Sequence, residues 1–272
     1  NWSPEHSLSV MDKETIATSI LSFTSPGIWY GDIAETRDLA RQCNDYLAGL
    51  VADRPDRFGG FAFLPLPDID SAVEECSRSL DDLKLDGITL LTSIDDKYIG
   101  HPDFEPLYAE LNRRKAIVFI HPCYPPGTEA DGWNIPRMLI DYPFETTRVA
   151  VNLILQGVVQ RYPDIKFIYT VSPVPLTATS TSEHVLIANN YSKSTLRAAV
   201  GDHVKSSQNS FYFPSYELIT HNTLGDWRFE KNLRSVSEEG LKFVMHHGFD
   251  EIKERENVSS QKVELKEKQE IQ

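Results

Sequence analysis

The sequence has 272 residues and a formal net charge of −13; 40% of its residues are hydrophobic and 25% are charged. A chain of this length can form one large domain or two small ones with a substantial buried core. The acidic balance argues against nucleic-acid binding, because phosphate contacts need clustered Lys and Arg. No apolar run approaches the roughly 20 residues that cross a membrane.

The three cysteines, Cys43, Cys76 and Cys123, are far apart and form no CxxC pair. This pattern predicts neither a disulfide framework nor a zinc ribbon, and it favours a cytoplasmic location. No secretory signal is visible, although the chain opens at Asn1 and its first methionine is Met11.

Short apolar runs alternate with helical patterns along the first 170 residues. Ser3 followed by Pro4 predicts a helix over residues 4–14. Amphipathic spacing predicts helices near residues 39–50, 73–83 and 104–111. Five runs predict buried strands: 18–23, 60–65, 87–93, 116–122 and 165–170. This alternation is typical of parallel strands covered by helices, in either a doubly wound sheet or a (β/α) barrel.

The pattern weakens after Thr170. Residues 171–210 are rich in Ser, Thr and Asn, with only a weak helical period near residues 195–200. His246 and His247 would face opposite sides of a strand, so we expect surface positions for both. Residues 250–272 are densely charged, which predicts a disordered tail or a solvated helix.

His121 stands at the end of the apolar run "AIVFIHP". In parallel α/β proteins the carboxyl ends of the strands build the active site, and a histidine there is suited to bind a metal ion. The alternative is a histidine packed in the core, because a catalytic zinc needs about three protein ligands and the pattern supplies one.

The runs "LNRRKAIVFIHP" and "LIDYPFETTRVAVNLILQGVVQRYPDIKFIYT" resemble the amidohydrolase-related decarboxylases, the relatives of aminocarboxymuconate-semialdehyde decarboxylase. The runs "FGGFAFLPLPDIDSAVEE", "LDGITLLTS" and "YIGHPDFEPLYAELNRR" are similar to the fungal 6-methylsalicylate decarboxylases within that family. The resemblance extends over residues 2–170 and is sustained rather than a single motif.

The resemblance implies a (β/α)8 TIM-like barrel of the metal-dependent amidohydrolase type. Residues 18–23 would form its second strand, so the first strand would lie before Asn1 or be absent. The barrel would then be incomplete in this chain, with irregular last strands. We therefore expect a single barrel domain over residues 1–249, family-like over 2–170 and divergent over 171–249, followed by the charged tail 250–272. Exposed strand edges and an open core would reduce its stability.

The family pattern also implies one divalent metal ion, zinc by expectation and manganese as the alternative. Its ligands would be an H-x-H on the first strand, the histidine of H-P on the fifth and an aspartate on the eighth. Only His121 matches, and Asp250 is the candidate for the late aspartate although the G-S-D motif is absent. Val171 stands where a catalytic histidine opening H-A-G-G is expected. No Walker loop or GxGxxG is present, so neither a nucleotide nor an organic cofactor is expected.

Residues that follow the predicted strands could line a substrate pocket. The candidates are Trp29, Tyr30, Thr92, Tyr124, Phe144 and Arg148. Ordinary loop packing is the alternative for each. Arg148 could bind a substrate carboxylate, and the alternative for it is a structural ion pair. Cys123 is expected to be a buried small residue rather than a nucleophile, because no activating base is fixed beside it.

By resemblance, we expect a metal-dependent non-oxidative decarboxylase of an aromatic or unsaturated carboxylic acid such as 6-methylsalicylate. The alternatives are a metal-dependent hydrolase of the same superfamily and an inactive remnant that lacks most metal ligands. The expected partner is a small aromatic carboxylic acid, and a homodimer is a family expectation. Neither nucleic acid nor membrane is expected as a partner.

Overall fold

The structure is a computed structural model that describes residues 2–13, 16–126, 141–221 and 225–248. The chain groups into two compact units, Asn1–Ile165 and Lys166–Gln272. Asp250 and the charged tail 250–272 lie outside the described residues. No helix within the described ranges is both long enough and apolar enough to cross a membrane.

The first unit contains a parallel sheet of four strands in the order β1-β2-β3-β6. These strands are β1 Ser19–Leu21, β2 Phe58–Phe63, β3 Gly87–Leu91 and β6 Val118–His121. Strands β4 Ser93–Ile94 and β5 Lys97–Tyr98 form a small antiparallel pair. The four predicted strands of this unit are confirmed within a few residues, and each is followed along the chain by a helix.

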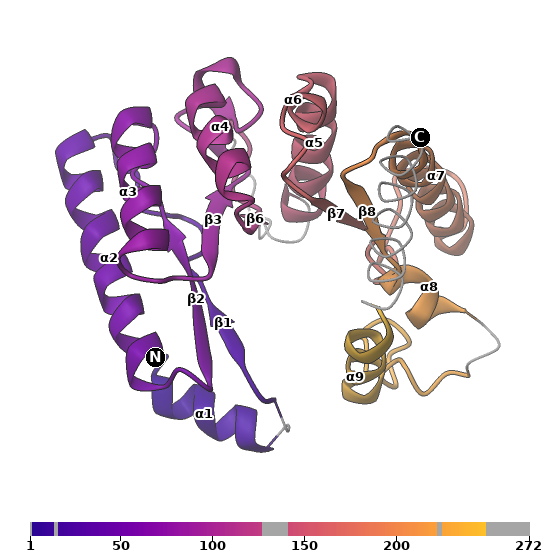
Figure 1. The fold of residues 1–272 in the computed structure, drawn as a ribbon. Helices are drawn as coiled ribbons and strands as arrows, with labels where there is room; N and C mark the ends of the chain where they lie inside the picture. Colours follow the sequence, from indigo (N-terminus) through magenta and orange to yellow (C-terminus); the bar gives the residue numbers. More distant parts are fainter. Residues whose placement is uncertain (1, 14–15, 127–140, 222–224, 249–272) are drawn as a thin grey trace, which may run out of the picture. The chain divides into compact units, whose positions relative to one another are not determined.

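Helices cover one face of the sheet, with α2, α3 and α4 side by side along the strands (Figure 1). The helices of this unit are α1 Pro4–Lys13, α2 Ile33–Asp53, α3 Ile69–Asp81, the 3-10 helix η1 Pro102–Phe104, α4 Glu105–Arg114, α5 Asp141–Leu155 and α6 Val158–Arg161. Parallel strands with helices on one face are the arrangement of an arc of a TIM barrel, so the unit has an α/β TIM-like fold.

Local sequence explains where these helices begin. The Ser3 hydroxyl accepts a hydrogen bond from the His6 amide, which confirms the predicted start of α1 at Pro4. The Asp32 and Asp68 side chains cap α2 and α3 in the same way. These caps satisfy amide groups that have no partner within the helix.

Both faces of strand β3 are buried, whereas strand β6 at the end of the sheet order is more exposed. The face beneath the helices contains fully buried side chains, including Ala62, Ile88 and Leu90. The strand register places Phe119 and His121 on the opposite face, where Phe119 is 43% exposed and its ring lies 6.4 Å from that of Phe61. His121 therefore shares a face with Phe119 and Leu91, on the more exposed strand β6.

The second unit is built on two parallel strands, β7 Phe167–Thr170 and β8 Ser210–Phe213. Its helices are α7 Val185–Ser206, α8 Ser215–Thr220 and α9 Glu238–His247. The apolar run at residues 165–170 predicted β7, whereas β8 was not predicted and the weak period near residues 195–200 covers only a fragment of α7. Val171 is buried beside Val204 and Tyr212 in the core of this unit.

His246 and His247 are exposed, as predicted, but the expectation that they lie on a strand is wrong. They end helix α9, where their rings lie 4.6 Å apart because neighbouring helical residues are rotated by about 100° rather than 180°.

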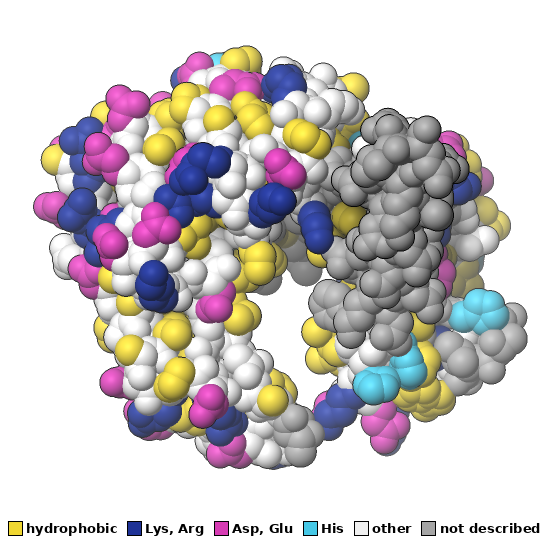
Figure 2. All heavy atoms as spheres, in the orientation of Figure 1, with side chains coloured by type: hydrophobic (Ala, Val, Ile, Leu, Met, Phe, Trp, Pro, Cys, Tyr) yellow, Lys and Arg dark blue, Asp and Glu magenta, His cyan; other side chains and the backbone are white. Residues whose placement is uncertain are grey.

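Acidic and basic side chains are interspersed over the visible surface of the molecule (Figure 2), which agrees with the mixed charge of the sequence.

Candidate functional site

His121 is the last residue of β6, as the sequence predicted. Its partner in the strand register is Leu91, and its backbone carbonyl accepts a hydrogen bond from the Thr92 amide at 3.1 Å. The ring Nδ1 lies 2.7 Å from the Pro122 carbonyl oxygen. Because a carbonyl oxygen only accepts hydrogen bonds, Nδ1 carries the proton and donates it. This fixes Nε2 of the neutral ring as the atom with a free lone pair, which is the form that binds a metal ion.

Aromatic side chains surround His121. Its ring meets those of Phe119 and Tyr142 edge to face, with centroids 6.2 Å away in both cases. Tyr142 in turn lies 5.9 Å from the ring of Tyr124, which is 45% exposed. Sequence analysis selected Tyr124 but missed Tyr142, which joins Tyr124 to the histidine. The cluster of His121, Tyr124 and Tyr142 offers flat apolar surface at the end of a strand.

Thr92 is completely buried and holds the segment after His121 in place. Its Oγ1 accepts a hydrogen bond from the Cys123 amide at 3.2 Å and lies 3.1 Å from the Cys123 Sγ. The Ser93 hydroxyl contacts the same sulfur at 3.2 Å. These contacts fit the packing interpretation of Thr92, and Cys123 is buried as expected.

Arg148 lies one turn after Glu145 on helix α5 and forms an ion pair with it. The Arg148 Nη1 donates to Glu145 Oε1 at 2.9 Å, and the Tyr98 hydroxyl donates to the same oxygen at 3.0 Å. Glu145 is fully buried, and its Oε2 has no hydrogen-bond partner among the described residues. Burial and the neighbouring carboxylate raise the pKa of Tyr98, while the hydrogen bond to Glu145 raises that of Arg148. This geometry favours the ion-pair interpretation of Arg148.

The remaining candidates lie on exposed segments. Tyr30 is 64% exposed, and its hydroxyl donates to the Gly27 carbonyl at 3.3 Å. Gly27 has a φ of +80°, and a Cβ there would lie 2.8 Å from Leu91, so only glycine lets this loop approach the end of β3. Trp29 lies beside Tyr30, and Phe144 is exposed on α5. None of the three has a hydrogen bond or ring contact with His121 within the described part of the chain.

The described residues do not complete a metal site. No group of three His, Cys, Asp or Glu side chains comes together within the described ranges. The chemistry of His121 fits one ligand position, whereas a mononuclear catalytic site needs about three protein ligands. No reaction step can therefore be derived through a metal ion on the described residues alone.

Comparison with known proteins identifies relatives of this chain. "Decarboxylase macB" of Penicillium terrestre is 47% identical over 181 residues, which cover 61% of this chain and 53% of the relative. The 6-methylsalicylic acid decarboxylase of Penicillium expansum is 36% identical over 171 residues, with 61% and 53% coverage. The chain spans about half the length of these curated relatives.

A solved structure shows the same fold. It is a dihydroxybenzoic acid decarboxylase from a Polaromonas species with bound manganese and the inhibitor 2-nitroresorcinol. Its TM-score is 0.56 at 27% identity, with coverage of 62% of this chain and 54% of that chain.

Two family patterns match the sequence. The pattern of the GSCFA family matches residues 142–248, which include all of the described second unit and the end of the first. The pattern of the Amidohydrolase family matches residues 2–170, more than half of the chain. These residues contain the parallel sheet, His121 and the aromatic cluster beside it. The chain belongs to the Amidohydrolase family.

Proposed function

We propose that this chain takes part in the metal-dependent, non-oxidative decarboxylation of a small aromatic carboxylic acid, and that His121 is one of the metal ligands. The observation that carries the proposal is the fixed ring of His121, whose Nδ1 donates to the Pro122 carbonyl and whose Nε2 is left with a lone pair. The activities named for the relatives supply the reaction and the class of substrate.

The residues beside His121 suit a planar substrate. Tyr124 and Tyr142 offer ring faces and edges at the end of β6, where an aromatic acid could pack against them. Among the other candidates, Trp29, Tyr30 and Phe144 supply exposed aromatic surface. Thr92 is buried beneath the segment that follows His121, so it would act by positioning that segment rather than by touching the substrate.

The metal ion would act as a Lewis acid that polarises substrate oxygens when it is bound. Manganese is as suitable as zinc, because the manganese-containing decarboxylase is similar to this chain. The ligands beyond His121 belong to the proposal. Asp250 stays the candidate for one of them, outside the described residues. Cytoplasmic location and homodimer formation also stay predictions, and the three free cysteines agree with a reducing compartment.

The test uses the purified chain with 6-methylsalicylate and added manganese or zinc. Decarboxylation breaks the bond between the ring and the carboxylate, places a proton on that ring carbon and releases carbon dioxide and 3-methylphenol. We expect both products at equal rates, and we expect their loss in His121→Ala. His6→Ala is the matched control, because His6 is exposed on α1.

Three outcomes separate the alternatives. Formation of 3-methylphenol that depends on His121 supports the proposal. Incorporation of oxygen from water into the product would instead show hydrolysis. No turnover of 6-methylsalicylate or of 2,6-dihydroxybenzoate with either metal would show that the chain alone is inactive. That third result fits a chain that presents one metal ligand in its described part.

A further inference from the structure

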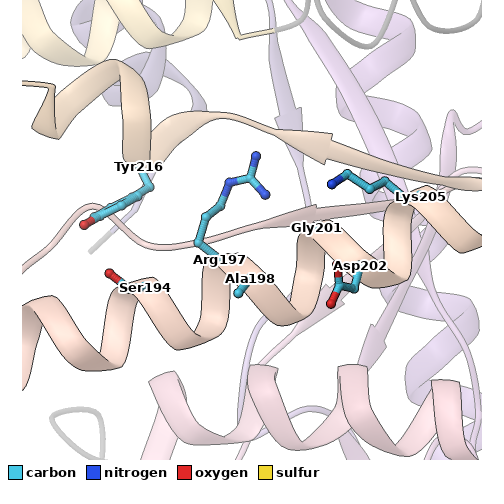
Figure 3. A pocket seen from close by; sticks show the side chains of 7 residues that line it. All are labelled: Ser194, Arg197, Ala198, Gly201, Asp202, Lys205 and Tyr216. Atoms are coloured by element: carbon cyan, nitrogen blue, oxygen red, sulfur yellow. The ribbon is translucent and has the colours of Figure 1, made fainter.

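Helix α7 has two faces with different surroundings. Ser194 and Gly201 lie on the face that lines a depression in the surface of the second unit (Figure 3). The neighbouring face packs on the buried core of this unit, through Leu196 and Val200. Lys193 precedes Leu196 by three residues and Val200 by seven, so it lies on this inner face.

Lys193 is buried although it carries an amine. Only 7% of its surface is exposed, and no hydrogen bond or ion pair joins it to another residue within the described part of the chain. Burial lowers the pKa of the Lys193 amine, and no charged neighbour among the described residues adds to this effect or opposes it. An ammonium ion without a counter-ion is costly in apolar surroundings, so a lysine in this position tends to lose its proton. The surroundings therefore favour the neutral amine, which is the nucleophilic form.

The position of Lys193 along the strands follows from two contacts of α7. The His203 Nε2, near the end of α7, lies 3.1 Å from the Ser210 hydroxyl oxygen at the start of β8. Arg197, earlier on α7, pairs with Glu217 on α8, the helix that follows the end of β8. Helix α7 therefore runs antiparallel to β8, and Lys193, one turn before Arg197, lies near the carboxyl end of that strand. Ligands of open parallel α/β sheets bind at this end of the strands.

Exposed apolar side chains lie at the Lys193 end of α7. The Asn189 Oδ1, one turn before Lys193, accepts a hydrogen bond from the Leu176 amide at 2.9 Å, so the loop before α7 passes along this part of the helix. Leu176 is exposed, and so is Leu186, which precedes Lys193 by seven residues and therefore shares its face of α7. Hydrophobic surface beside a polar group favours a ligand with an apolar body. An aromatic aldehyde combines such a body with the carbonyl group that an amine attacks.

We propose that Lys193 is a reactive amine that forms an imine with a small aromatic aldehyde. Its Nζ attacks the carbonyl carbon, and a C=N double bond replaces the C=O bond. The carbonyl oxygen leaves as water with two protons from the amine, so the step needs neither an oxidant nor a reductant. The site is separate from His121 and does not depend on the proposed decarboxylation.

The experiment treats the full chain at pH 7 with limiting benzaldehyde and with cyanoborohydride, which reduces the imine to a stable benzylamine. Peptide mass spectrometry then compares the labelling of Lys193 with that of Lys231, an exposed lysine of the same unit, and separates both from the N-terminal amine. The neutral fraction of an amine near pH 7 rises about tenfold for each unit by which its pKa falls, so we expect Lys193 to be labelled at least about threefold faster. In concentrated urea this preference should disappear, because it depends on burial.

Lys193→Met separates lost reactivity from lost folding. Methionine removes the amine and keeps an unbranched side chain of similar length. Total labelling should fall, whereas the Tm should stay the same or rise, because an apolar group replaces a buried amine without a partner among the described residues. Lys231→Met is the matched control and should leave the labelling of Lys193 unchanged. The proposal is overturned if Lys193 reacts no faster than Lys231, if the preference persists in urea, or if Lys231→Met abolishes the labelling of Lys193.

Discussion

Replacing Thr92 by valine should destabilise the first unit, because it removes the side-chain hydrogen bond that joins the segment after β3 to the segment after β6, while the backbone hydrogen bond from the Thr92 amide to the His121 carbonyl stays. Valine has nearly the same shape as threonine but has no hydroxyl. The Cys123 amide would lose the acceptor that now lies 3.2 Å away, and its Sγ would lose a contact at 3.1 Å. Leaving one buried donor without a partner costs about 1–3 kcal/mol. For a unit of this size that corresponds to a fall of roughly 2–12 °C in Tm.

Thr89→Val is the matched control for Thr92→Val. Thr89 lies on β3, three residues before Thr92, and is about as buried, but its hydroxyl has no hydrogen-bond partner among the described residues. Valine there removes a buried polar group without breaking a bond, so the Tm should stay the same or rise. Both variants are compared by calorimetry and urea unfolding. The reasoning is wrong if Thr92→Val is as stable as the unmodified chain, or if Thr89→Val loses as much stability as Thr92→Val.

Two further predictions concern stability. Asn44→Leu should lower the free energy of unfolding by about 3 kcal/mol or more. The buried Asn44 amide forms hydrogen bonds with the Phe63 N–H and carbonyl, both at 2.9 Å, and with Glu75, and leucine would leave these groups without a partner. A loss under about 1 kcal/mol in urea unfolding would contradict this. The hydrogen bond from Arg113 lowers the pKa of Glu110 from 4.5 to about 2. Its stabilisation is therefore complete above about pH 4.5 and lost as the pH falls toward 2. Glu110→Gln should flatten the fall in stability over that interval, and an unchanged pH profile would refute the assignment.

The strands of the first unit could be predicted because each is a short, nearly continuous apolar run. Strands β2 and β3 are buried on both faces, which requires such runs. His121 could be placed at a strand end for the same reason. Its tautomer could not be predicted, since it depends on the position of the Pro122 carbonyl.

Other features depend on contacts between distant residues. The contact of the Tyr142 ring with His121 cannot be seen in a local sequence pattern. Tyr142 could still have been named as a pocket candidate, because it lies two residues before the candidate Phe144. The pairing of Arg148 with the buried Glu145 at i and i+3 was detectable from spacing alone. Helix α7 was only partly found because just two of its residues, Lys193 and Val204, are buried, so its apolar period is weak. Strand β8 is four residues long and lies in a polar region, so its run alone was too short to predict a strand.

The most direct test of the central claim is the metal content of the purified chain, measured by elemental analysis after gel filtration in the presence of manganese or zinc. We expect nearly one metal ion per chain for the unmodified protein and for His6→Ala, and a clear loss for His121→Ala. Absence of metal from the unmodified chain, or the same content in His121→Ala, would show that the histidine at the end of β6 is not a metal ligand.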